Sequence, residues 1–366
     1  MFRSFKIPVV FCVVCFAGVG LAEAAINIEV VTVGDPGNAG EWSGENYGGF
    51  GPDRVCGAVG YTYNIGKYEV TAGQYTAFLN AKAKTDTYTL YNSGMSNTTY
   101  GSGITRSGGG VVGNPYSYTV EDNFVSRPVN FVTFWDACRF TNWLHNGQGD
   151  GDTETGAYTL DGYNGADGRW ITRNLGAQWF LPSEDEWYKA AYYKGGSTNA
   201  GYWDFPTKSD AAAPPGRDMA DVSGNNANYA GSPSPIDSPY WITLVGEFHS
   251  SASPYGTFDQ GGNVQEWNEE ILHPFPYDWS RGMRGGSFAY DESYLLASAR
   301  GAGYPSYDYV QGYIIGFRVA SAVPEPATLI IWSLLGTLAI GAGWWKKRRA
   351  AWANGVAGTM QSARLG

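Results

Sequence analysis

The sequence predicts one α+β domain, spanning about residues 26–321, with short strands, a few helices and very long loops. Short alternating runs indicate strands, only three segments have the spacing and caps of helices, and residues 196–254, rich in Pro, Gly and Asn, predict loops. The 51 glycines, 26 tyrosines and 14 tryptophans suit a loop-rich extracellular fold with an aromatic core. Because no unit of about 20–50 residues repeats, a solenoid is excluded.

The first elements are strands followed by a helix. The run "INIEVVTVGDPGNAG", from Ile26, predicts a strand and a turn, and residues 61–65 alternate as a second strand. Thr71 is a candidate cap for a helix whose apolar face is Tyr75, Phe78 and Leu79. Residues 82–122 have weak patterning and many Gly, Ser, Thr and Tyr, which predicts a long surface excursion.

Two further helices have clear start signals. The run "RPVNFVTFWDACRFTNWLHNG" predicts a strand and then a helix that Thr133 caps and Gly147 ends. In "WFLPSEDEWYKAAYYKGG", Ser183 and Glu186 form an S-x-x-E capping box, and Gly195 closes the helix. The acidic residues of this segment also fit a glycosidase pair, but capping and the helix dipole explain them better.

Both ends of the chain carry features of export signals. Residues 1–24 combine two basic residues, an apolar run and the A-x-A cleavage site Ala22–Ala24, which predicts a secretory signal peptide; a retained membrane helix is the alternative. Residues 327–345 are apolar and long enough to span a bilayer core. The basic residues 346–349 that follow suit a cytoplasmic flank.

The part of the chain between these signals is strongly acidic. It keeps 17 of the 24 basic residues and 32 of the 34 acidic residues. Such a surface repels nucleic acid and favours cations, and outside the cell calcium is the available hard cation. The acidic run "GDGDTETGAYTLDG", residues 149–162, lacks the spacing of an EF-hand, so it predicts a solvated hairpin rather than a calcium loop.

Two cysteines, Cys56 and Cys138, remain after removal of the signal peptide. In an exported domain they form either one disulfide or two buried free thiols. The apolar helical pattern around Cys138 slightly favours free thiols. Other catalytic signatures are missing from the sequence, which has no G-x-S-x-G, no H-E-x-x-H and no P-loop.

Six segments together resemble the formylglycine-generating enzyme, or sulfatase-modifying factor, family. In chain order they are "YNIGKYEVTAGQYTAFLN", "RPVNFVTFWDACRFTNWL", "WFLPSEDEWYKAAYYKGG", "GTFDQGGNVQEWNEE", "RGMRGGSF" and "GFRVA". They cover most of residues 58–320 in the family's order. The resemblance implies a fold similar to that of a C-type lectin.

The resemblance also implies a cleft without its usual metal ligands. The family's copper-dependent oxidases convert a sulfatase cysteine to formylglycine and hold copper with two cysteines, in a pattern like R-G-G-S-(aromatic)-x-C-x-x-x-x-C. Here these positions hold Tyr290 and Leu295, and neither side chain can supply a thiolate to copper. Ser287 and Tyr294 keep the family's pattern, whereas Gln265 replaces the usual tryptophan of G-N-V-W-E-W. Copper is therefore not expected, and Arg284 and Arg300 are expected to donate to backbone carbonyls or carboxylates.

A second branch of the family holds iron with histidines from an added helical domain. This chain has no such domain, and its three histidines, His145, His249 and His273, lie far apart in the sequence. An iron site is therefore not expected.

The family binds calcium with side-chain and carbonyl oxygens of two loops, and both loops have counterparts here. The pattern (N/D)-x-x-G-N-x-x-E falls on four residues: Asp259, Gly262, Val264 and Glu266. By spacing alone, the second loop falls on another four: Asn228, Tyr229, Asp237 and Pro239. Oxygen-only ligands suit calcium. The alternative for the first loop is a glycine turn followed by a solvated Glu.

The C-terminal segment resembles the bacterial PEP-CTERM sorting signal. Val323-Pro324-Glu325-Pro326, one apolar helix and a basic cluster cover residues 323–349, and a tail of residues 350–366 follows. The resemblance implies recognition by an exosortase-type protease and membrane attachment through the helix before processing. It also implies export across the inner membrane to the bacterial cell surface or the extracellular matrix.

Two classes of function fit these features. The first is a non-catalytic, calcium-stabilised domain that binds or assembles at the cell surface, with a polysaccharide or a protein as partner. The second is an oxidoreductase with an altered metal site. The missing cysteine pair favours the first class. The aromatic content also suggests a carbohydrate binder, although core packing absorbs most aromatic residues in such a fold.

Overall fold

The computed structural model describes residues 25–43, 54–272, 279–306 and 312–323. The predicted signal peptide, the apolar segment 327–345 and almost all of the sorting signal lie outside these ranges. Within them, no helix is both long enough and apolar enough to cross a membrane.

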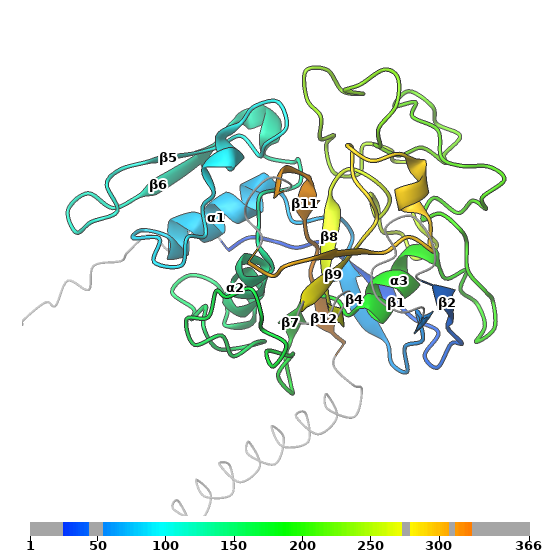
Figure 1. The fold of residues 1–366 in the computed structure, drawn as a ribbon, viewed down its shortest axis with the longest axis horizontal. Helices are drawn as coiled ribbons and strands as arrows, with labels where there is room; N and C mark the ends of the chain where they lie inside the picture. Colours follow the sequence, from blue (N-terminus) through cyan, green and yellow to red (C-terminus); the bar gives the residue numbers. More distant parts are fainter. Residues whose placement is uncertain (1–24, 44–53, 273–278, 307–311, 324–366) are drawn as a thin grey trace, which may run out of the picture.

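Two four-stranded sheets form the centre of the fold (Figure 1). The first is antiparallel, in the order β1 (Val30–Val33), β4 (Tyr63–Gly66), β12 (Ala320–Ala322) and β7 (Trp179–Phe180). The second has the order β10 (Gly301–Gly303), β9 (Ser280–Arg284), β8 (Gln265–Leu272) and β11 (Ile315–Gly316), with β11 parallel to β8. These strands and the long loops around them confirm the predicted α+β class.

The described part of the chain has three α-helices: α1 (Ala72–Lys82), α2 (Phe134–His145) and α3 (Glu184–Tyr192). Each begins with a complete capping box, at Thr71, Thr133 and Ser183 respectively, so all three predicted caps are confirmed. Helix α3 ends at Tyr192, before the predicted stop at Gly195. The backbone of the next residue, Tyr193, is already extended. Four short 3-10 helices complete the described helical elements: η1 (Ser93–Ser96), η2 (Asp122–Phe124), η3 (Glu292–Leu295) and η4 (Gly312–Ile314).

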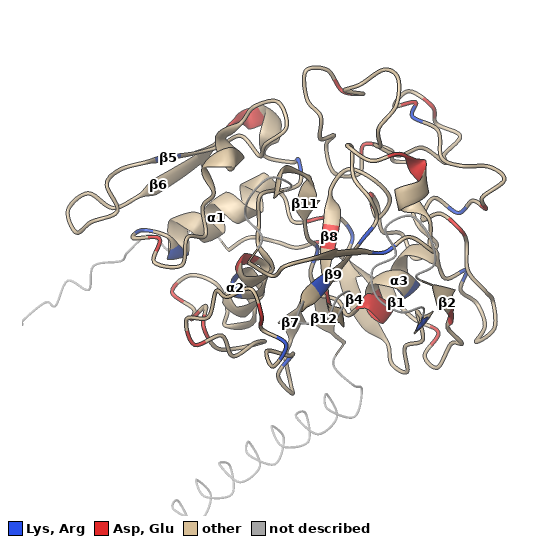
Figure 2. Ribbon diagram, in the orientation of Figure 1, with Lys and Arg blue, Asp and Glu red and all other residues tan. Residues whose placement is uncertain are grey.

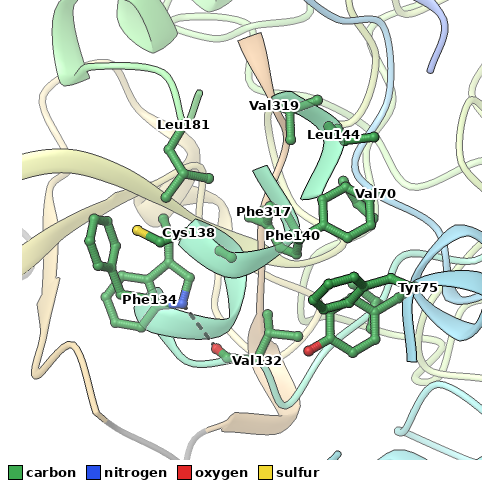
Figure 3. Close-up of a cluster of buried hydrophobic side chains, with 14 of the residues drawn as sticks. Val70, Tyr75, Val132, Phe134, Cys138, Phe140, Leu144, Leu181, Phe317 and Val319 are labelled. Atoms are coloured by element: carbon green, nitrogen blue, oxygen red, sulfur yellow. Dashed lines mark hydrogen bonds between the residues drawn. The ribbon is translucent and has the colours of Figure 1, made fainter. Parts of the chain in front are cut away.

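Helix α2 runs through the main core (Figure 3). Its Phe140 packs against Tyr75 of α1, with ring centroids 6.1 Å apart, and against Phe317, with centroids 5.4 Å apart. Cys138 lies on the same helix as a buried free thiol, and Cys56 is also buried and free. The favoured alternative of two free thiols is therefore confirmed.

Residues 82–122 are more ordered than the sequence predicts. Strands β5 (Ile104–Ser107) and β6 (Ser117–Val120) pair as a hairpin that projects from the side of the molecule near α1 (Figure 1). The hairpin was not predicted because its outward positions are Thr and Ser, which pair across the strands through their hydroxyls. A second two-stranded sheet joins β2 (Glu41–Ser43) to β3 (Arg54–Cys56).

The acidic run 149–162 folds as a capped turn. The Asp152 carboxylate accepts hydrogen bonds from the amides of Glu154 and Thr155, and Glu154 pairs with Arg139 at 2.8 Å. These contacts engage both carboxylates within the run itself, and no strands pair within residues 149–162, so the predicted hairpin is wrong.

We expect Asp136 of α2 to make stability depend on pH. Burial raises the pKa of Asp136 to about 7, whereas an exposed Asp titrates near about 3.9. Between these values the folded state holds a proton that the unfolded state lacks, so the free energy of unfolding falls as pH rises. Asp136→Asn keeps an oxygen for the Thr133 cap and should flatten the profile of urea unfolding between pH 5 and 8. The exposed Asp122→Asn is the control, and equal slopes in wild type and Asp136→Asn would contradict the assignment.

Candidate ligand cleft and calcium loops

A cleft of about 220 Å³ lies against β8, β9 and β10. Three of the four predicted cleft residues line it: Gln265, Tyr290 and Tyr294. The rings of Tyr290 and Tyr294 are stacked, with centroids 4.4 Å apart and planes inclined by 16°. Ser287 is buried and does not line the cleft; its hydroxyl accepts a hydrogen bond from the Ala289 amide at 3.3 Å.

The two positions that hold copper-binding cysteines in the family's oxidases differ in their surroundings here. Tyr290 forms part of the wall, whereas Leu295 is fully buried beside Phe205 and Ala227. Of the two described thiols, Cys56 lies behind the cleft, where its sulfur accepts a weak contact from Arg284 Nη2 at 3.5 Å. Burial and the nearby Glu184 carboxylate raise the pKa of Cys56 to about 11, so it is a neutral thiol at physiological pH.

Buried ion pairs support the floor of the cleft. Arg284 and Arg300 each donate through Nε to Glu184 Oε1 at 2.8 Å, and Arg54 reaches the other oxygen of Glu184 at 3.1 Å. Arg284 also donates to the carbonyls of Ala297 and Ala299, so the structural role predicted for both cleft arginines is confirmed. Although burial favours the neutral acid, these arginines hold the pKa of Glu184 below its usual value.

The same contacts argue against a glycosidase pair in "PSEDEW". Glu186 closes the capping box of α3 and pairs with Arg173, while Asp185 pairs with Arg54 at 2.7 Å. Acidic positions of β8 and α3 lie close to basic positions of β9 in Figure 2. Each of these carboxylates is therefore neutralised by an arginine.

The first predicted calcium loop leads into β8. Glu266 is fully buried; Arg318 donates to both of its carboxylate oxygens, at 2.6 and 2.7 Å, and Trp187 Nε1 donates at 2.7 Å. The alternative of a solvated Glu is therefore wrong. Gly262 has a φ of +88°, and a Cβ at this position would lie 2.2 Å from the Asn228 carbonyl oxygen, so only glycine fits.

The residues of the second predicted calcium loop do not all lie beside the first loop. The Asn228 carbonyl accepts from the Asn263 amide at 2.7 Å, which places Asn228 against the first loop. By contrast, Asp237 pairs with Arg127 at 2.7 Å, and the Tyr229 hydroxyl donates to the Pro215 carbonyl at 2.6 Å. Pro239 lies within a turn in which the Tyr240 amide donates to the Asp237 carbonyl.

The first loop offers one carboxylate beside backbone carbonyls. Asp259 is partly buried, and one of its oxygens accepts from the Gly246 amide at 2.6 Å. Burial raises the pKa of Asp259 to about 6. Among the described residues no three His, Cys, Asp or Glu side chains converge with metal-binding geometry, so an ion here would also need the carbonyls of Gly262 and Val264. Carboxylates and carbonyls together suit calcium.

Sequence reasoning missed Glu69, which shares this charged neighbourhood. Its side chain is 2% exposed, neither carboxylate oxygen has a hydrogen-bond partner, and burial raises its pKa well above the usual value. Asp259, Arg318 and Glu266 are the charges that act on it. In the sequence, Glu69 stands between Tyr68 and Val70, two residues before the cap of α1.

No iron-binding histidine cluster is found in the described ranges. His145 Nδ1 accepts from the Gln178 amide at 2.9 Å, and His249 is exposed. His273 lies outside the described residues.

We expect Glu266→Gln to destabilise the fold strongly. The change would leave the buried guanidinium of Arg318 without its counter-charge, and breaking a buried ion pair costs about 3–5 kcal/mol. Glu29→Gln is the matched control, because Glu29 is largely exposed and pairs with Lys67 at 3.5 Å, which is worth at most about 1 kcal/mol. Urea unfolding measures both variants, and similar losses for the two would contradict this account of Glu266.

The fold is similar to that of several solved structures. These include "Treponema denticola variable protein 1" (22% identity, TM-score 0.46, 80% of this chain and 95% of that chain). The structure titled "Crystal Structure of CarF" has 22% identity and a TM-score of 0.48, covering 81% of this chain and 99% of that chain. PvdO from Pseudomonas aeruginosa has 19% identity and a TM-score of 0.42, covering 81% and 92%.

The family assignment comes from the sequence. No curated protein matches it. The family model described as "Sulfatase-modifying factor enzyme 1-like domain" matches residues 52–323, most of the chain. The chain therefore belongs to the sulfatase-modifying factor (formylglycine-generating enzyme-like) family.

Proposed function

We propose that this protein is a non-catalytic, calcium-stabilised binding or assembly module that acts outside the bacterial inner membrane. The observation that carries the proposal is the cleft, whose two ligand positions hold a stacked tyrosine and a buried leucine. A tyrosine phenol is a poor ligand for Cu(I), and a leucine side chain is none.

The lining of the cleft supports binding rather than redox chemistry. The Tyr290–Tyr294 pair gives it an aromatic wall, and the amide of Gln265 adds hydrogen-bonding groups beside that wall. Cys56 lies behind Arg284 and stays protonated, so it does not replace the missing thiolates. A cell-surface polysaccharide or protein is the proposed partner.

Calcium is the proposed ion of the Asp259 loop. Asp259 would provide a carboxylate, and Gly262 and Val264 would provide carbonyls. Glu266, which pairs with Arg318, would contribute by orienting the loop or by sharing an oxygen with the ion. An ion held only by the folded state would raise the free energy of unfolding.

The absence of catalysis can be tested with a cysteine-containing sulfatase peptide. We expect the purified protein to leave the peptide unchanged, even with copper and a reductant, because the cleft offers no thiolate. Tyr290→Cys with Leu295→Cys is the matched variant; it should gain copper binding and remain inactive, since Gln265 also departs from the family's cleft. Mass spectrometry reads the result, and aldehyde formation by the unaltered protein would overturn the proposal.

Export is the second testable part of the proposal. The A-x-A site at Ala22–Ala24 and the sorting signal at residues 323–349 support a mature chain that begins near Ala25 and lies outside the inner membrane. We expect N-terminal sequencing of the protein from the membrane or extracellular fraction to start there. Recovery of the full-length chain from the cytosol would contradict this localisation.

A further inference from the structure

The side-chain amide of Gln265 is nearly buried, yet it makes no hydrogen bond to the described part of the chain. The residue is 6% exposed and lines the cleft. Buried polar groups are normally hydrogen-bonded, so an amide that is left open toward a cleft is available to a ligand. It offers that ligand both a donor and an acceptor.

Strand β10 leaves room for this amide. Gly301 pairs with Met283 of β9 and lines the same cleft. A Cβ at Gly301 would clash with Nε2 of Gln265. The glycine therefore allows the amide to lie where it does, between the strand and the open space of the cleft.

The stacked pair of Tyr290 and Tyr294 gives the cleft a flat apolar surface beside the amide. A pyranose ring has a C–H face that packs against an aromatic ring and hydroxyls around its edge that both donate and accept hydrogen bonds. An aromatic wall next to a free amide is complementary to these two features.

The arginines in the cleft lining carry no uncompensated charge. Arg284 and Arg300 both pair with Glu184, and the third arginine of the network pairs with the same carboxylate and with two others. The network consists of three arginines and three carboxylates: Arg54, Arg284, Arg300, Glu184, Asp185 and Glu270. Because these charges balance, the cleft favours a neutral ligand over an anion such as a uronic acid or a phosphate.

We propose that the cleft binds one neutral hexopyranose residue of a polysaccharide, an inference that rests on the non-catalytic binding function proposed above. The sugar ring packs on the Tyr290–Tyr294 pair, and its hydroxyls bond to the amide of Gln265. The cleft volume of about 220 Å³ is below the range of about 300–1,000 Å³ that is typical for drug-sized ligands, which suits a single ring. An extended peptide is the competing occupant.

Ligand-detected saturation-transfer NMR on the purified protein separates these occupants. The probes are the methyl glycosides of glucose, galactose, mannose and glucuronic acid, together with the sulfatase peptide. We expect at least one neutral glycoside to bind, and the glucuronide to bind more weakly. The inference is wrong if no neutral glycoside binds, if the glucuronide binds equally well, or if the peptide alone gives a signal.

Variants of the cleft locate the binding. Gln265→Ala and Gly301→Ala should each weaken binding of the neutral glycoside by about three- to tenfold, since one removes the amide and the other displaces it. Tyr294→Ala should weaken binding by about tenfold, whereas Tyr294→Phe, which keeps the ring, should retain most of it.

Trp170→Ala is the matched control, because Trp170 is 61% exposed and does not line the cleft. It should bind the glycoside as the wild type does, and melting temperatures show that each variant is folded. Wild-type affinity in folded Gln265→Ala and Tyr294→Ala would overturn the inference and leave the non-catalytic function standing. Aldehyde formation on the sulfatase peptide would instead overturn the proposed function itself.

Discussion

The buried ion pair between Arg318 and Glu266 connects both central sheets of this fold. Arg318 lies just before β12, and it binds Glu266 on β8 together with the carbonyls of Gly66 and Phe258. Trp187 of α3 donates to the same carboxylate. One fully buried pair thus joins the two central sheets, the third helix and the loop before β8. Its desolvation cost is met by hydrogen bonds on both partners.

The cleft depends on this pair through the alternation of β8. Successive side chains of a strand point to opposite faces, so the strand that turns Glu266 inward presents Gln265 to the cleft. A second buried network, centred on Glu184, holds Arg284 and Arg300 in the lining of the same cleft. Buried ion pairs therefore hold the wall of the cleft in place, although the two positions that hold cysteines in the family's copper enzymes are Tyr290 and Leu295.

The features that were predicted correctly from the sequence depend on interactions between residues that are close together in the chain. The caps at Thr71, Thr133 and Ser183 were correct because a capping box lies within four residues. The β5–β6 hairpin was missed because polar hydroxyl pairs, rather than apolar alternation, face outward along it. The isolation of Glu69 was not predictable, since its charged neighbours lie about 190 to 250 residues away and only the fold brings them together. For the same reason, spacing alone could not show that Asp237 pairs with Arg127.

We propose that this member of the family holds calcium and no redox metal. The most direct measurement is the metal content of the purified protein, determined by elemental mass spectrometry after dialysis against metal-free buffer. We predict calcium at stoichiometric amounts, with copper and iron at trace levels. Stoichiometric copper or iron, or a folded protein that retains no calcium, would contradict the account.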